Sequence, residues 1–80
     1  MNIKIKVTDE NTSLKAQEAC FNANIFYSSS KDKTGVIHGA KYLYVTDKLM
    51  YGLDDDIFAK EDAIEMNPED FINKLNAEES

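Results

Sequence analysis

The stretch from Lys41 to Leu53, KYLYVTDKLMYGL, constrains the fold most, because it predicts a β-hairpin. Aliphatic and aromatic residues alternate here with the period of two that is typical of a strand. A two-residue turn at Asp47-Lys48 and a four-residue loop from Thr46 to Leu49 both pair Val45 with Met50. That register places Leu43, Val45 and Met50 on a face suited to the core, and Tyr42, Tyr44 and Tyr51 on the other.

The three tyrosines Tyr42, Tyr44 and Tyr51 then have three possible environments. They can lie under a helix, be half buried at the rim of the sheet, or form an exposed recognition patch. Tyrosine is common at protein interfaces because a large apolar ring ends in a hydroxyl group. The predicted hairpin therefore supplies either a second packing layer or a binding surface.

The first part of the chain predicts a strand followed by a helix. In the segment Asn2 to Val7, Ile3, Ile5 and Val7 alternate with lysines, as in a half-buried strand. Capping residues then precede a helix expected from about Asn11 to Asn24. Its apolar face would consist of Leu14, Phe21 and Ile25, and small residues line the opposite side.

The part of the chain after the hairpin predicts a turn, an edge strand and a final helix. Asp54 to Asp56 form an acidic turn, after which Ile57-Phe58 anchors the chain in the core. Residues 63–66 predict a short edge strand. Asn67 caps the last helix, Pro68 occupies its first position, and residues 76–80 are expected to fray.

These elements predict one α+β domain over residues 1–80, in the order β-α-β-β-(β)-α. Two helices would pack on one face of a small antiparallel sheet. A domain of 80 residues buries a modest core, so a homodimer would add stability.

The charge of the chain is divided unevenly along its length. The net charge is −6, with seven lysines against five acids in residues 1–53 and two lysines against ten acids in residues 54–80. All nine basic residues are lysine, so arginine, the usual bidentate ligand of phosphate, is absent. This balance argues against direct binding to nucleic acid, which requires a basic surface, and predicts attraction to a basic protein.

The acids concentrate in one block, which is the main candidate binding site. It holds eight carboxylates within seventeen residues: Asp54, Asp55, Asp56, Glu61, Asp62, Glu65, Glu69 and Asp70. The block would serve equally as a solvated face that keeps a small protein in solution. As a functional surface, it would dock onto a basic partner with help from Tyr42, Tyr44 and Tyr51, in the place of nucleic acid.

No catalytic, cofactor or metal signature accompanies this block. His38 and Cys20 are the only residues of their types, too few for the usual four-ligand zinc site. The acids from Asp54 onward do not match the calcium-binding EF-hand, and the glycines match neither phosphate-binding nor dinucleotide-binding loops. We therefore expect no enzyme, no cofactor and no metal.

The sequence also predicts a cytoplasmic location. Neither a secretion signal nor an apolar run long enough for a membrane span is present, so we expect no membrane partner. The single Cys20 cannot form an internal disulfide, which fits a reducing compartment.

The motifs YLYV, LMYG, Ile57-Phe58 and IEMNPEDFINKL together resemble small accessory proteins of large tailed bacteriophages, of the host-takeover or anti-defence type. The resemblance covers the organisation of residues 14–75, and the lysine-only, Asn-rich composition is similar to that of proteins from AT-rich phage genomes. It implies a modulator that binds and inhibits a host enzyme, toxin or defence complex, in some cases by mimicking nucleic acid. It transfers no functional residue.

Two functions from different classes follow. The first is an inhibitor that binds a basic host protein in the host cytoplasm through the acidic block and the tyrosines. The alternative is a small-ligand module for a nucleotide-type molecule, in which Tyr27, Tyr42 or Tyr44 and the loop from Ser28 to Gly35 line a pocket that a dimer interface could complete.

Overall fold

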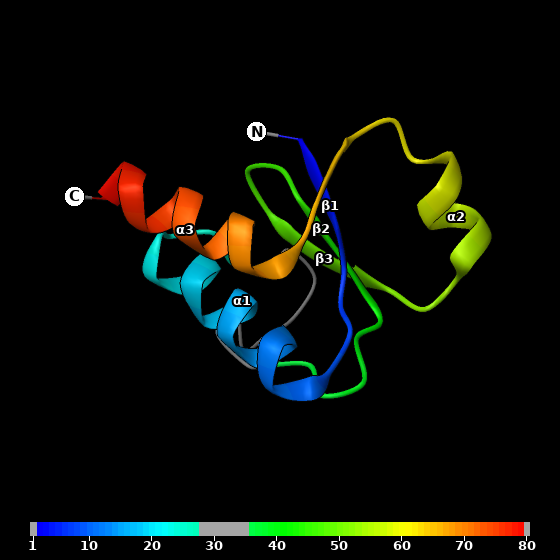
Figure 1. Ribbon diagram of the computed structural model, residues 1–80, viewed down its shortest axis with the longest axis horizontal. Helices are drawn as coiled ribbons and strands as arrows, with labels where there is room; N and C mark the ends of the chain where they lie inside the picture. Colours follow the sequence, from blue (N-terminus) through cyan, green and yellow to red (C-terminus); the bar gives the residue numbers. More distant parts are fainter. Residues whose placement is uncertain (1, 28–35, 80) are drawn as a thin grey trace.

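The computed structural model describes residues 2–27 and 36–79 as an α+β fold (Figure 1). Within these described residues, four strands form one sheet, in the order β3-β2-β1-β4, and three helices complete the fold. The elements are β1 (Ile3–Lys6), α1 (Glu10–Asn22), β2 (Tyr42–Val45), β3 (Leu49–Gly52), α2 (Asp55–Lys60), β4 (Ile64–Met66) and α3 (Pro68–Glu79). The predicted fold class and the approximate order are confirmed.

The sheet is mixed, whereas the sequence predicted an antiparallel one. Strands β1 and β2 are antiparallel, as are β2 and β3, but β4 runs parallel to β1, with Ile3 opposite Ile64. Since β3 is therefore also parallel to β4, the chain must cross from one end of the sheet to the other between them. Helix α2 lies in this crossover, and β1 becomes a central strand.

The hairpin register is one residue away from the predicted register. Val45 pairs with Leu49 and Leu43 with Tyr51, and Thr46 to Lys48 form a three-residue connection. Leu49 is fully buried and Met50 is 54% exposed, so the observed register buries leucine in place of methionine. A slip of one residue exchanges the faces of a strand. Tyr51 thus lies on the core face, away from Tyr42 and Tyr44.

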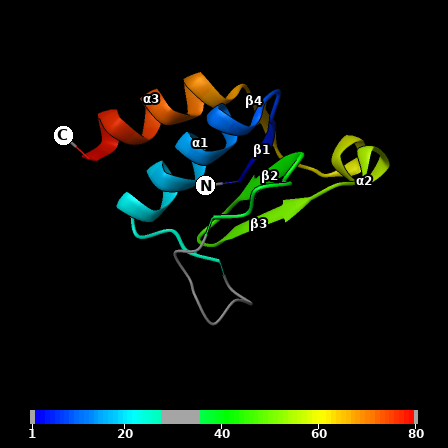
Figure 2. The same ribbon diagram turned by 90° about the horizontal axis from the view of Figure 1, so that it is seen from below.

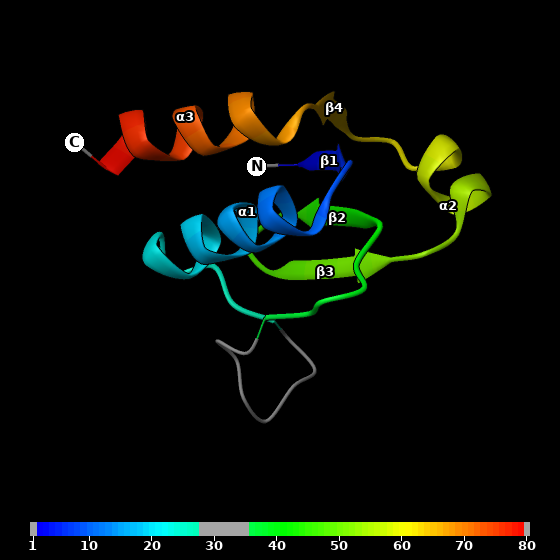
Figure 3. The ribbon, with the colours of Figure 1, turned by 60° about the horizontal axis from the view of Figure 1, so that its bottom comes forward.

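The core lies between the sheet and the helices α1 and α3, which pack side by side on one face (Figures 2 and 3). This arrangement confirms the prediction of two helices on one face. The main buried apolar side chains are Ile3, Ile5, Leu43, Val45, Leu49, Phe71 and Leu75.

Helix α1 buries the side that the sequence analysis placed opposite its apolar face. Its buried residues are Ser13, Ala16, Gln17, Ala19 and Cys20. Leu14 and Phe21, predicted to lead the apolar face, are only partly buried. Small side chains let the helix approach its neighbours closely, because the separation of packed helices depends on the side chains at the contact.

The C-terminal end of α1 directs the chain toward the outer edge of the sheet. Asn24 adopts a left-handed conformation with φ 62°, and the Ile25 N–H donates to the Cys20 carbonyl at 2.8 Å. This is the Schellman arrangement that ends many helices. Tyr27 then bridges to Leu49, and the Leu49 N–H donates to the Phe26 carbonyl at 2.9 Å. This contact helps to set the register of β3.

The predicted start of α3 is confirmed. The Asp70 N–H donates to Oδ1 of Asn67 at 2.8 Å, and Nδ2 of Asn67 donates to the Asp70 carboxylate at 3.0 Å. Phe71 is fully buried beyond this cap. The helix continues to Glu79, so fraying of residues 76–80 stays a prediction, and Ser80 lies outside the described residues.

The predicted acidic turn is in fact the beginning of α2. The Asp54 carboxylate accepts hydrogen bonds from the N–H groups of Asp56 and Ile57, at 2.8 and 3.3 Å. Asp54 is thus the N-cap, and Asp55 and Asp56 lie in the first turn, where acids stabilise a helix. In Figures 1 and 3 this helix stands apart from α1 and α3.

Candidate functional site

Phe58 and Lys4 hold α2 against the face of the sheet that points away from α1 and α3. The Phe58 ring is buried and stacks on Tyr42, with ring centroids 4.3 Å apart. Nζ of Lys4 lies 4.8 Å from the centre of the same ring and donates to the carbonyls of Phe58 and Glu61, at 2.8 and 3.2 Å. The expected anchor is therefore Phe58 alone, in a small second cluster, because Ile57 is 57% exposed.

All eight carboxylates of the acidic block are exposed. They follow α2, the connection to β4, β4 itself and the first turn of α3, which Figure 1 shows as one continuous path from the far end of the molecule to its middle. Three of them also have structural roles, since Asp54 caps α2, Asp70 joins the cap of α3, and Asp55 contacts the sheet.

Asp55 is the member of the block that pairs with a lysine. Its carboxylate lies 2.8 Å from Nζ of Lys41 and also accepts a hydrogen bond from the Tyr42 hydroxyl. The Lys41 hydrogen bond, then the Tyr42 hydrogen bond, hold the pKa of Asp55 below its ordinary value of 3.8. Among the described residues, the Lys41–Asp55 pair is the ion pair that the structure gives between this block and a lysine. All eight acids of the block nevertheless stay exposed to solvent.

The three hairpin tyrosines do not form the single face that the sequence predicted. Tyr42 is 4% exposed beneath α2, and Tyr44 is partly buried beside it. Tyr51 is 49% exposed on the opposite face, where its ring packs edge-on against Tyr27. The register shift is the reason, since it turns Tyr51 away from the other two.

A small cleft lies between α2 and the outer face of the hairpin. Its volume is about 140 Å³, and Tyr44, Met50, Ile57, Glu61 and Ala63 form much of its wall. The Tyr44 hydroxyl is buried and has no hydrogen-bond partner among the described residues. The sequence analysis missed this cleft because it assigned Met50 and Ile57 to the core. The exposure of Met50 depends on a register that differs by one residue from the predicted one.

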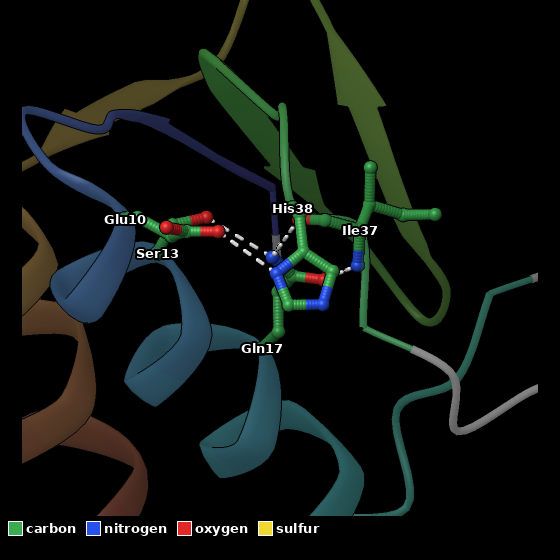
Figure 4. Close-up of polar contacts among 5 residues, drawn as sticks. All are labelled: Glu10, Ser13, Gln17, Ile37 and His38. Atoms are coloured by element: carbon green, nitrogen blue, oxygen red, sulfur yellow. Dashed lines mark hydrogen bonds and ion pairs between the residues drawn. The ribbon is translucent and has the colours of Figure 1, made fainter.

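Gln17 forms the most extensive buried polar cluster that the structure describes (Figure 4). Its Oε1 accepts from the Tyr27 hydroxyl at 2.6 Å and from the Ile37 N–H at 2.8 Å. Its Nε2 donates to the Ile37 carbonyl at 2.9 Å and to Oγ of Ser13 at 3.0 Å. Tyr27 and Ile37 lie on the two sides of the predicted loop from Ser28 to Gly35, which is outside the described residues.

His38 pairs with a carboxylate at the surface, and Cys20 lies in the core. Nδ1 of His38 lies 2.8 Å from the Glu10 carboxylate at an exposed site (Figure 4). Cys20 is fully buried, and this burial raises the pKa of its thiol to about 12. Among the described residues, no three His, Cys, Asp or Glu side chains lie close enough to hold a metal ion.

The tyrosine-lined pocket of the alternative hypothesis has little room in the described part of the chain. Tyr27 and Tyr42 are buried, and their hydroxyls bind Gln17 and Asp55. The cleft beside Tyr44, at about 140 Å³, is below the roughly 300–1,000 Å³ of typical small-molecule sites. The loop from Ser28 to Gly35, which would line the rest of this pocket, lies outside the described residues, so the alternative stays a prediction.

Comparisons with known proteins give no information about the function of this chain. No family model, curated protein or solved structure matches this chain. None of the described helices is both long and apolar enough to cross a membrane. The binding surface proposed below therefore rests on the exposure of the acidic block.

Proposed function

We propose that this chain is a non-enzymatic protein-binding module whose acidic block docks onto a basic surface of a partner protein. The observation that carries the proposal is the exposure of eight carboxylates on one continuous segment. Such a surface steers a positively charged partner toward it and excludes partners of like charge.

The inhibitory role belongs to the same proposal and has a separate basis. It follows from the resemblance of the sequence to phage accessory proteins, which implies a host enzyme, toxin or defence complex as the partner. A row of carboxylates can occupy a basic site that otherwise receives nucleic acid, because the partner's cations recognise negative charge in both cases. The expected partner is therefore a host protein with an exposed basic surface.

Two double variants of equal net charge distinguish docking through the acidic block from an effect of the net negative charge of the whole protein. Asp62→Asn/Glu65→Gln removes two exposed carboxylates from the block, and Glu18→Gln/Asp47→Asn removes two exposed carboxylates from outside it. Each variant has a net charge of −4 in place of −6. The four side chains form no ion pair within the described residues, so both variants should fold.

The variants are tested by affinity capture from a bacterial lysate at about 50 mM and about 300 mM salt, because screening weakens exposed charge pairs. We expect the Glu18/Asp47 variant to retain a partner at low salt, and the Asp62/Glu65 variant to bind it about three- to tenfold more weakly, since each exposed pair contributes up to about 1 kcal/mol. Equal binding by both variants, or capture unaffected by salt, would contradict acidic docking.

A further inference from the structure

The cleft beneath α2 combines apolar walls with negative charge. Met50 and Ile57 line it and are 54% and 57% exposed, although side chains of this kind are usually buried. Glu61 lines the same cleft and is exposed, and no side chain in residues 2–27 or 36–79 forms an ion pair with it. An apolar surface and an uncompensated carboxylate therefore face one small space.

The Tyr44 side chain links this space to the acidic block. Burial, followed by the negative charges of Glu61 and Asp54, raises the pKa of the Tyr44 phenol. Both negative charges thus disfavour ionisation of the Tyr44 hydroxyl. The hydroxyl has no hydrogen-bond partner among the described residues, and a buried polar group without a partner costs free energy.

The volume of the cleft limits what can enter it. About 140 Å³ is too small for a nucleotide-sized ligand but suits one long side chain. Lysine and arginine have apolar stems that pack on apolar surfaces while their charged ends reach polar groups. Met50 and Ile57 match such a stem, and Glu61 matches the charge at its end.

We propose that the cleft lined by Tyr44, Met50, Ile57 and Glu61 receives a lysine or arginine side chain of the basic partner. The stem packs between Met50 and Ile57, and the cationic end pairs with the Glu61 carboxylate. This inference rests on the proposed function, since the cleft provides the specific contact within a surface that attracts the partner by charge. A purely apolar anchor is the competing occupant, and Glu61 argues against it, because a buried carboxylate without a partner is costly.

Three peptides separate these possibilities. The probe Ac-Gly-Lys-Gly-Lys-Gly-Lys-Gly-NH₂ carries both stem and charge. A second peptide replaces each lysine with diaminopropionic acid, which keeps the ammonium on a single methylene. A third replaces each lysine with norleucine, which keeps an apolar stem without charge. Binding is measured from the NMR signals of the Met50 and Ile57 methyl groups.

We expect the lysine peptide to shift both methyl signals and to bind at least about fivefold more tightly than either other peptide, because only lysine satisfies both parts of the cleft. Glu61→Gln should reduce this preference over diaminopropionic acid to less than twofold. Its backbone carbonyl still accepts from Lys4, so α2 should stay in place. The Asp62→Asn/Glu65→Gln variant should weaken both cationic peptides equally and leave the preference unchanged.

The outcomes distinguish this inference from the proposed function. Equal binding of the lysine and diaminopropionic acid peptides would overturn the cleft proposal and leave acidic docking intact. Binding of the norleucine peptide as tight as that of the lysine peptide would identify an apolar anchor and also overturn it. Failure of both cationic peptides to bind would overturn the cleft proposal together with the acidic docking on which it rests.

Discussion

Gln17 forms the most extensive set of buried side-chain hydrogen bonds among the described residues. The amide of this fully buried residue makes four hydrogen bonds, to Ser13, Tyr27 and both backbone groups of Ile37. A buried amide is costly unless its donors and acceptors are satisfied, and here they are. The residues before and after the segment 28–35 are thereby held against α1.

Replacing Gln17 with leucine should destabilise the protein more than the loss of one hydrogen bond would. The Tyr27 hydroxyl and both Ile37 backbone groups would lose their partner, so we expect the free energy of unfolding to fall by about 2–4 kcal/mol. Ser13→Ala removes one of the four bonds and should cost about 1 kcal/mol. Urea denaturation measures both losses of stability. Equal losses would show that the Gln17 side chain does not hold Tyr27 and Ile37 against α1.

Asp55 should give the protein a pH-dependent increment of stability. Because its folded pKa lies below the ordinary value of 3.8, protonation favours the unfolded chain. The increment is therefore fully present above about pH 4 and is lost as the pH falls through the lower folded pKa. It depends on the contacts with Lys41 and Tyr42.

Urea midpoints between pH 7 and pH 2 test this expectation. Wild type should be more stable than Asp55→Asn at neutral pH, and the difference should shrink on acidification below about pH 4. Asp47→Asn removes the same charge from the hairpin turn, where no ion pair joins the described residues, and should follow the wild-type profile. A constant difference between wild type and Asp55→Asn would exclude the carboxylate as its source.

At the scale of secondary-structure elements, those with local signals were predictable. The start of α3 follows from Asn67-Pro68 and the two acids after it, because a cap and a proline act within one turn. The alternation in β1 likewise gives a strand, Ile3–Lys6, from neighbouring residues alone. The acidic block could also be read directly, since charge is a property of the residues themselves.

The elements that the sequence analysis misplaced depend on partners far away in the chain. The register of β3 depends on a contact from Phe26 to Leu49, and α2 is held by Lys4 of β1. The buried side of α1 consists of Gln17 and small residues, and a search for regularly spaced large apolar residues does not find such a side. The cleft could not be predicted because it depends on both the register of β3 and the position of α2.

Lys4→Met tests the attachment of α2 to the sheet. Methionine keeps an apolar stem but leaves the Phe58 and Glu61 carbonyls without the ammonium. The free energy that holds α2 against the sheet should fall by about 1–2 kcal/mol, which should speed hydrogen exchange of the α2 amides by about five- to thirtyfold. Exchange in β1 and β2 should change less, because the strand pairing remains.

Lys6→Met is the matched control, since Lys6 is exposed on the same strand and no hydrogen bond joins it to α2 in the described residues. It should leave exchange in α2 near the wild-type rate. If both variants speed exchange equally, the Lys4 hydrogen bonds are not what holds the helix.

At the scale of the whole molecule, the negative charge of residues 54–80 should weaken the fold at low ionic strength. This part of the chain contains ten acids and only two lysines. Like charges repel one another when the chain is compact. Raising NaCl from about 0.02 M to 0.2 M should therefore raise the free energy of unfolding by about 0.5–1 kcal/mol, as the Debye length shortens.

The matched double variants localise this repulsion. Asp62→Asn/Glu65→Gln should reduce the dependence of stability on salt more than Glu18→Gln/Asp47→Asn, although both have the same net charge. Urea midpoints at the two salt concentrations make the comparison. Equal salt dependence in the two variants would mean that the repulsion is spread over the molecule.

The central place of β1 has a consequence for the order in which the protein assembles. Residues 3–6 pair with residues 42–45 on one side, and residues 3–5 with residues 64–66 on the other. Contacts between such distant segments require large loops to close and slow the search for the native topology. Because both partner segments of β1 come later in the sequence, both edges of β1 stay unpaired during synthesis until residues 42–45 and 64–66 have been made. We therefore expect a chaperone that binds extended segments to contact β1 during this interval.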